Sequence, residues 1–141
     1  MTLAITGVIS LNTMLDDETM NNTADDWVAF LEENVEEDAY IIVDDPTEHK
    51  LIYDFYLPHV SSIYTESLLG KNVEEELSDF LEHSDGHQIW YVIDYRQQRI
   101  GADTIQDCLK KLQYYLEPAG RYIIEQKDLE VFRVEEMQYE K

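Results

Sequence analysis

The chain has 141 residues, the usual size of one domain, and is long enough to bury most of the apolar surface of its unfolded form. Its 31 Asp and Glu residues against 10 Lys and Arg give a formal net charge of -21, which repels nucleic-acid phosphates and anionic lipid headgroups. This charge excludes direct binding to nucleic acid. It leaves open a solvated acidic surface, a cationic partner, a halophilic habitat or mimicry of nucleic-acid charge.

Cysteine content and the N-terminus bear on the compartment. The single cysteine, Cys108, excludes an internal disulfide, which fits the cytosol without excluding an extracytoplasmic location. Residues 3–9 are mostly apolar but have no basic flank and no cleavage site, so they are not a secretory signal, and a bilayer crossing needs about 20 apolar residues. We therefore treat residues 1–15 as a first element or the end of a membrane helix, and residues 16–141 as a single soluble α/β domain.

Hydrophobic periodicity predicts four helices. The first begins near Asp26, where apolar residues recur at helical spacing opposite a row of glutamates. The second starts at Pro46, ends before Pro58 and leaves Tyr53 as its most exposed aromatic residue. The third covers residues 73–81, and the fourth is capped by Thr104, extends to Leu116 and is closed by residues 118–120. The core stripe expected for the second helix is Leu51, Ile52, Phe55 and Tyr56.

Short apolar runs predict the strands. Residues 39–43 and 88–93 are apolar on both faces, which is typical of strands buried between two layers. Residues 60–64 form a further strand, and residues 122–124 and 129–134 form a closing pair. Because strands and helices alternate through the middle of the chain, we expect right-handed βαβ crossovers. The predicted fold is an α/β three-layer Rossmann-like sandwich, with a mostly parallel sheet and an antiparallel C-terminal edge.

Polar residues follow the two predicted central strands. Asp44 and Asp45 come after the first strand, and Asp94, Tyr95 and Arg96 come after the second. Ligands of open parallel sheets collect outside the carboxyl ends of the strands, so these five are candidate ligand-binding residues, and the three carboxylates would suit a hard cation. The alternative is that each Asp caps the turn that follows its strand. We favour this second interpretation and predict neither a metal nor a cofactor.

Tyr53 completes the set of candidate ligand-binding residues. It belongs to a group of aromatic residues that would offer a platform for stacking on sugar rings, although periodicity assigns most of that group to the core.

The remaining motifs do not indicate catalysis. His83 and His87 are four residues apart, but the sequence between them breaks a helix, which favours a solvated loop over a metal site. His49 and His59 have no companion nucleophile placed by the sequence, and no glycine-rich phosphate loop follows any strand. We therefore predict no catalytic residue.

Several segments together resemble a known domain. Residues 25–31 (DDWVAFL), 39–43 (AYIIV), 51–56 (LIYDFY), 88–93 (QIWYVI) and the closing strand at 129–134 look like the soluble C-terminal domain of polytopic membrane glycosyltransferases. These enzymes are similar to dolichyl-phosphate-mannose protein mannosyltransferases and aminoarabinose transferases, and the likeness covers roughly residues 10–135. In that family the membrane portion and its loops carry the catalytic acid and the site for the polyprenyl-phosphate sugar donor. This chain departs from the family in starting at Met1 without membrane helices and in its acidity.

The resemblance implies an accessory domain on the extracytoplasmic face of a membrane, with a role in acceptor binding, lid formation or assembly and no catalysis by itself. Its partners would be the membrane portion of the same enzyme and a carbohydrate or lipid-linked sugar. The alternative hypothesis is a free-standing acidic interaction protein or inhibitor in the cytoplasm. Such a protein would bind a basic partner surface, as a mimic of nucleic-acid charge.

Overall fold

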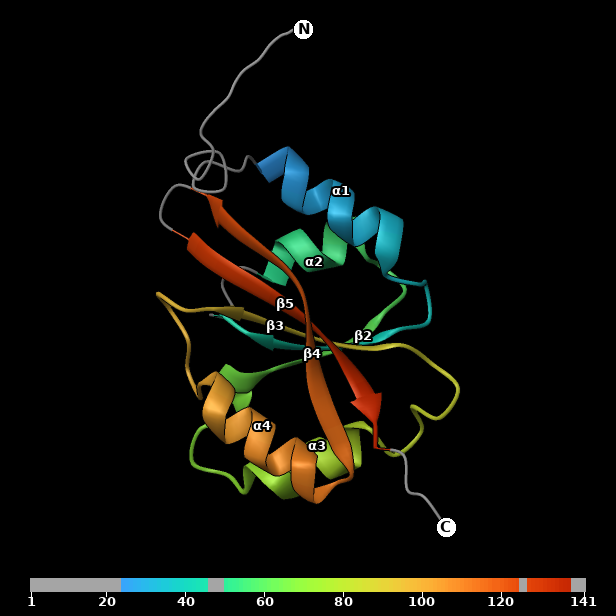
Figure 1. Ribbon diagram of the computed structural model, residues 1–141, viewed down its shortest axis with the longest axis vertical. Helices are drawn as coiled ribbons and strands as arrows, with labels where there is room; N and C mark the ends of the chain where they lie inside the picture. Colours follow the sequence, from blue (N-terminus) through green and yellow to red (C-terminus); the bar gives the residue numbers. More distant parts are fainter. Residues whose placement is uncertain (1–23, 46–49, 125–126, 138–141) are drawn as a thin grey trace, which may run out of the picture.

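The computed structural model describes residues 24–45, 50–124 and 127–137, and these form one five-stranded sheet with helices against it (Figure 1). The strands lie in the order β2-β1-β3-β5-β4. In chain order the elements are α1 (Ala24–Asn34), β1 (Tyr40–Asp44), α2 (Lys50–Tyr56), β2 (Ser61–Tyr64), the 3-10 helix η4 (Thr65–Leu68), α3 (Val73–Phe80), β3 (Ile89–Asp94), α4 (Ala102–Lys111), β4 (Tyr114–Ile124) and β5 (Lys127–Glu136).

The two apolar runs of the sequence are the neighbouring central strands β1 and β3, as expected. They pair in parallel, with Ile41 opposite Trp90 and Val43 opposite Val92. Every residue of β3 is buried, as are all residues of β1 except the half-buried Tyr40. Both strands are therefore covered on both faces, which is why their sequences do not alternate between apolar and polar residues.

Two hydrophobic clusters lie on opposite faces of the sheet. One contains Trp27 and Leu31 of α1, Tyr53 of α2 and the side chains of Ile41 and Val43 that point to that face. The other contains Ile42 from between them in β1, packed with residues of α3 and α4 such as Leu77, Ile105 and Leu109. In Figure 1, α1 and α2 lie above the sheet and α3 and α4 lie below it. The alternation of side chains along β1 thus supplies both cores from one strand.

The sheet is mixed, so the expected mostly parallel, three-layer Rossmann-like sandwich is wrong. Parallel pairing is confined to β1 with β2 and β1 with β3, whereas β5 runs antiparallel to both β3 and β4. The antiparallel strands β4 and β5 are also the longest, with 11 and 10 residues. They follow each other closely in the chain, and strands joined by a short connection pair antiparallel. The hairpin then joins the sheet through β5 and makes its second half antiparallel.

The end of the fourth helix was also mispredicted. Helix α4 ends at Lys111, and Leu116 and Pro118 belong to β4, where the pairing register shifts between Pro118 and Gly120. Gln113 has a φ of 79°, a left-handed conformation that stops the helix and redirects the chain. Proline is tolerated here because β4 is an edge strand with a bulge.

The buried face of α2 is the opposite of the predicted one. Tyr53 is 2% exposed and packs in the core with Leu57 one turn later, whereas Phe55 is 76% exposed and Tyr56 36%. The helix is only seven residues long, so its apolar positions do not define one face unambiguously. Pro46 and the side chains of Leu51 and Ile52 lie outside what the structure describes.

None of the helices within residues 24–45, 50–124 and 127–137 combines the length and apolar character that a membrane crossing requires. Residues 1–15, expected to form a first element or the end of a membrane helix, lie outside the described ranges.

Replacing Gln113 by Gly should stabilise the domain. A side chain in the left-handed region costs about 1–2 kcal/mol, part of which is offset by the greater freedom of Gly in the unfolded chain, so we expect a gain of about 0.5–1 kcal/mol. Urea unfolding monitored by tryptophan fluorescence measures the change. The control Gln113→Ala keeps the strained conformation and should give no gain; a Gly variant no more stable than the Ala variant would contradict the argument.

Candidate functional site

The carboxyl ends of β1 and β3 bring three of the predicted site residues together. Asp44 ends β1 and is followed by Asp45, and Asp94 ends β3 beside them in the parallel register. All three residues are buried. Buried carboxylates require partners, and those partners decide what this cluster can do.

Asp44 is fully engaged by the protein itself. Its Oδ1 accepts hydrogen bonds from the Thr65 hydroxyl (2.7 Å) and from the backbone N–H groups of Arg99 (2.7 Å) and Ile100 (3.2 Å). Its Oδ2 accepts from the Tyr91 hydroxyl (3.0 Å) and the Gly101 N–H (2.8 Å). Five donors around one carboxylate satisfy it without a bound ligand.

These bonds fasten the loop that leads into α4. Gly101, with a φ of 104°, is the N-cap residue of α4 and has no side chain to cap the helix, so the predicted cap at Thr104 is wrong. The Asp44 carboxylate, supplied by β1, binds the N–H groups of residues 99–101 instead. Asp44 therefore fixes a loop that is remote from it in the sequence, rather than capping the turn that follows its own strand.

Lys127 lies between the other two carboxylates. Its Nζ donates to both carboxylate oxygens of Asp45 (3.0 and 3.3 Å) and to Oδ2 of Asp94 (3.1 Å). The Lys127 side chain is 22% exposed, whereas the carboxylates are 2% and 0% exposed, so water screens this group of charges only from one side. The position where a hard cation was considered is thus occupied by an ammonium group.

Asp94 also fixes the backbone on both sides of the sheet end. Its Oδ1 accepts from the N–H of Arg96, two residues later, and from the N–H of Asp128 in β5. Arg96 itself is exposed. Asp94 and Arg96 are therefore only two residues apart but differ in burial.

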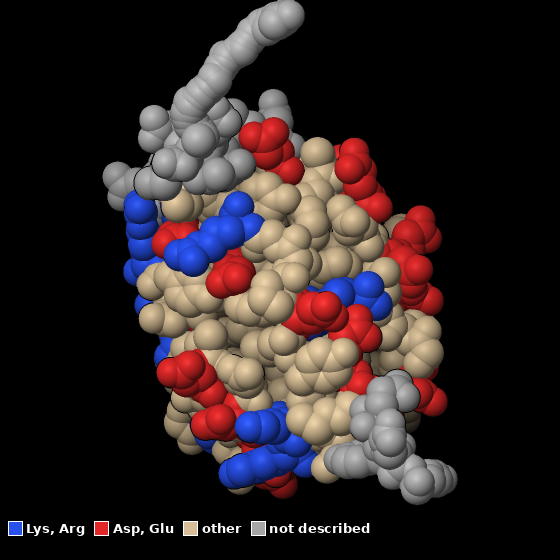
Figure 2. Space-filling model, viewed as in Figure 1, with Lys and Arg blue, Asp and Glu red and all other residues tan. Residues whose placement is uncertain are grey.

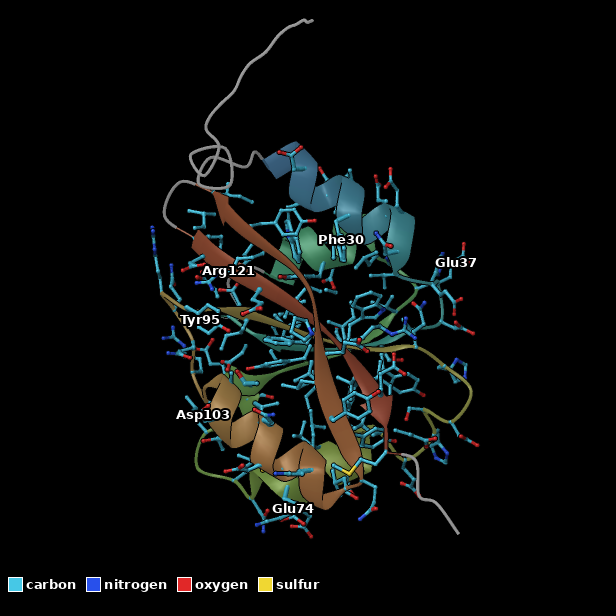
Figure 3. The ribbon with its side chains drawn as sticks, in the orientation of Figure 1. Phe30, Glu37, Glu74, Tyr95, Asp103 and Arg121 are labelled. Atoms are coloured by element: carbon cyan, nitrogen blue, oxygen red, sulfur yellow. The ribbon has the colours of Figure 1, made fainter. Side chains whose placement is uncertain are left out.

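A second charged network lies beside the first, over Tyr95. The Tyr95 hydroxyl donates to Glu130 (2.6 Å), and the Arg121 guanidinium lies 4.9 Å from the centre of the Tyr95 ring. Arg121 also donates two hydrogen bonds of 2.9 Å to the carboxylate of Asp128, which lowers the pKa of Asp128. Burial and the bond to Glu130 raise the pKa of Tyr95. Figure 3 shows Tyr95 and Arg121 close together at the left edge.

Two buried tyrosines lie next to the carboxylates. Tyr91 donates a hydrogen bond to Asp44, and Tyr53 packs in the hydrophobic core. Burial, followed by the charges of Asp45 and Asp94 among others, raises the pKa of Tyr53 well above its ordinary value. Burial and the adjacent Asp44 carboxylate likewise raise the pKa of Tyr91. Both tyrosines therefore keep their hydroxyl protons at neutral pH. Because Tyr53 is buried, it cannot serve as an exposed platform for stacking on a sugar ring.

The chemistry open to this cluster is limited by its internal pairing. General acid–base work needs a carboxyl group within reach of a substrate, and Asp44, Asp45 and Asp94 face donors of the domain itself. Within the described ranges, no group of three or more His, Cys, Asp or Glu side chains is arranged to hold a metal ion. His83 is exposed in a turn, and Nδ1 of His87 lies 3.0 Å from a carboxylate oxygen of Asp38.

A surface that the sequence reasoning missed lies elsewhere, where α1 ends. A groove of about 230 Å³ is lined by Val35, Leu57 and Val60 and by the side chains of Glu32, Glu36 and Glu37. Tyr56 also lines it, and the exposed Phe55 contacts Tyr56 edge-on with ring centres 4.8 Å apart. In Figure 3, Glu37 lies on the opposite side of the molecule from Tyr95. This groove is thus distinct from the carboxylate cluster at the strand ends.

Comparison with known protein families, with characterised proteins and with solved structures finds no match to this chain.

Removing the Asp44 carboxylate should destabilise the domain strongly. Asp44→Ala leaves five donors without their acceptor, two of them in buried and three in part-buried hydrogen bonds, and we expect a loss of about 3–5 kcal/mol of unfolding free energy. Asp44→Asn retains one acceptor oxygen and should lose only about 1–3 kcal/mol. Urea unfolding gives both values, with the exposed Asp79→Asn as a control expected within about 0.5 kcal/mol of the unmodified chain. Equal stability of Asp44→Ala and the control would disprove the anchoring role.

Lys127 should matter through the two carboxylates that it neutralises. Lys127→Met leaves Asp45 and Asp94 buried beside each other without its ammonium group, at an expected cost of about 3–5 kcal/mol. Adding Asp45→Asn and Asp94→Asn to that variant removes the charges that repel each other, and should restore part of the lost stability. Thermal unfolding of the single and triple variants tests this. A triple variant less stable than the single one would show that the charge balance is not the reason.

Proposed function

We propose that this chain is a non-catalytic accessory domain of a membrane glycosyltransferase, which contributes acceptor binding, a lid or assembly contacts. The observation that carries the non-catalytic part is the internal pairing of Asp44, Asp45 and Asp94. These carboxylates lie at the carboxyl ends of the central strands, where a ligand would bind, but they accept hydrogen bonds from donors of the same domain. Because these three carboxylates are paired within the domain, the strand ends are better suited to maintaining the fold than to acid–base chemistry.

The glycosyltransferase part rests on the resemblance. Its three opening segments correspond to α1, β1 and α2, and its later segment corresponds to β3. These elements include one of the two parallel strand pairs, β1 with β3, and the corrected orientation of the C-terminal hairpin does not alter their order along the chain. The placement of the domain on the extracytoplasmic face of a membrane is part of the same proposal.

The reading frame upstream of Met1 tests the proposal. We expect it to continue in frame into several membrane-spanning segments, and the longer enzyme to transfer sugar from a polyprenyl-phosphate donor. We further expect the isolated domain to show no transfer with the same donor. An in-frame stop codon and a ribosome-binding site immediately upstream of Met1, or transfer by the isolated domain, would contradict the proposal.

A second candidate function is supported by the distribution of charge. Exposed acidic side chains gather on the outer faces of α1 and α3 and on the turns that follow them, including Glu33, Glu37, Glu75, Asp79 and Glu82. Figure 2 shows a run of Asp and Glu along the right-hand edge of one face. Such surfaces suit a free-standing acidic protein that binds a basic partner. A partner held by charge alone should be released steeply as salt rises, which a pull-down in low and high salt measures.

A further inference from the structure

The groove at the end of α1 combines an apolar base with an acidic rim. Val35 and Leu57 are buried at 9% and 7% exposure and form its base with the half-buried Val60. Glu32, Glu36 and Glu37 are exposed around it. An apolar depression that remains open at the surface is a common feature of binding sites, and here it lies at the junction of α1 and the segment from α2 to β2.

Two exposed aromatic rings extend the groove on one side. Tyr56 lines it, and Phe55, which is 76% exposed, packs edge-on against the Tyr56 ring. Their exposure follows from the orientation of the short helix α2, which buries Tyr53 and turns Phe55 and Tyr56 outward, while Leu57, the next residue after the helix, is also buried. Keeping such a ring exposed has no benefit for the stability of the core, whereas aromatic side chains are enriched at protein interfaces.

The electrostatics of the groove favour a cation. No Lys or Arg of the described segments lines it, and the described part of the chain contains no ion pair of Glu32, Glu36 or Glu37 with a basic side chain. An anionic ligand would be repelled by the three carboxylates, and a neutral one would gain nothing from their charge. A Lys or Arg side chain fits both parts, because its methylene stem packs on apolar surface while its charged end reaches the rim.

We propose that the groove formed by Glu32, Val35, Glu36, Glu37 and residues 56–60 is a docking site for a basic, partly apolar segment of a partner protein. The partner's Lys or Arg residues pair with the three glutamates, and an adjacent apolar side chain enters the base of the groove. A cation also gains from lying over the faces of the Tyr56 and Phe55 rings. This inference requires neither of the two proposed functions, because it concerns only the chemistry of the partner.

A labelled peptide of alternating lysine and leucine tests the site. We expect fluorescence anisotropy to show binding to the full chain in low salt and much weaker binding in high salt. The triple variant Glu32→Gln, Glu36→Gln, Glu37→Gln should bind about tenfold more weakly. The matched control Glu75→Gln, Asp79→Asn, Glu82→Gln removes the same number of exposed charges from α3 and its following turn, and should change the affinity by less than about twofold.

The aromatic side of the groove is tested separately. The double variant Phe55→Ala, Tyr56→Ala should lower the affinity about fivefold while leaving the unfolding midpoint nearly unchanged, because both rings are exposed. A peptide with serine in place of leucine should bind more weakly to the unmodified chain, and one with glutamate in place of lysine should not bind. Absence of binding in low salt, an equal loss with the α3 control, or no effect of the aromatic double variant would each overturn the proposal.

Discussion

The structure depends on one buried carboxylate, that of Asp44, which accepts hydrogen bonds from several parts of the same chain. Asp44 stands at the end of a central strand, and five donors from three other parts of the chain converge on it: Thr65 of η4, Tyr91 of β3 and the N–H groups of residues 99–101. Because Asp44 is buried, its charge must be satisfied internally, and the donors that satisfy it set the path of the loop into α4. The same constraint acts on Asp45 and Asp94, which Lys127 neutralises from β5. The strand ends, which commonly bind ligands in α/β proteins, here hold the loop before α4 and the start of β5 in place.

Much of the local structure could be predicted because the physical signals are local. The apolar runs that contain Ile41 and Trp90 identify two adjacent buried strands, and the spacing of Val73 and Leu77 identifies α3. Strand direction could not be predicted in the same way, since the side chains of β5 alternate similarly in a parallel or an antiparallel pairing. The continuation of α4 into a strand was missed because Leu112 and Leu116 fit helical spacing, and the positive φ of Gln113 leaves no mark in the sequence.

The site shows the same division between local and long-range information. The adjacency of Asp44, Asp45 and Asp94 followed from two neighbouring strands, but Lys127, which pairs with two of them, is separated from Asp45 by 82 positions and from Asp94 by 33. Only the antiparallel register, in which the start of β5 meets the end of β3, brings Lys127 to them. The one available signal was the scarcity of basic residues, which makes each Lys in so acidic a chain a candidate for a specific partner. The groove was missed because the exposure of Phe55 and Tyr56 depends on which face α2 buries.

The strand order has a consequence for how the chain is assembled during its synthesis. Among the described strands, β5 comes last in the chain, yet it lies between β3 and β4 and not at an edge of the sheet. Until it emerges from the ribosome, β3 lacks one neighbour, β4 lacks its pairing partner and the carboxylates at the end of β1 and β3 lack their lysine. The early segments can therefore form only part of the sheet, and the sheet is completed only once β5 has been synthesised.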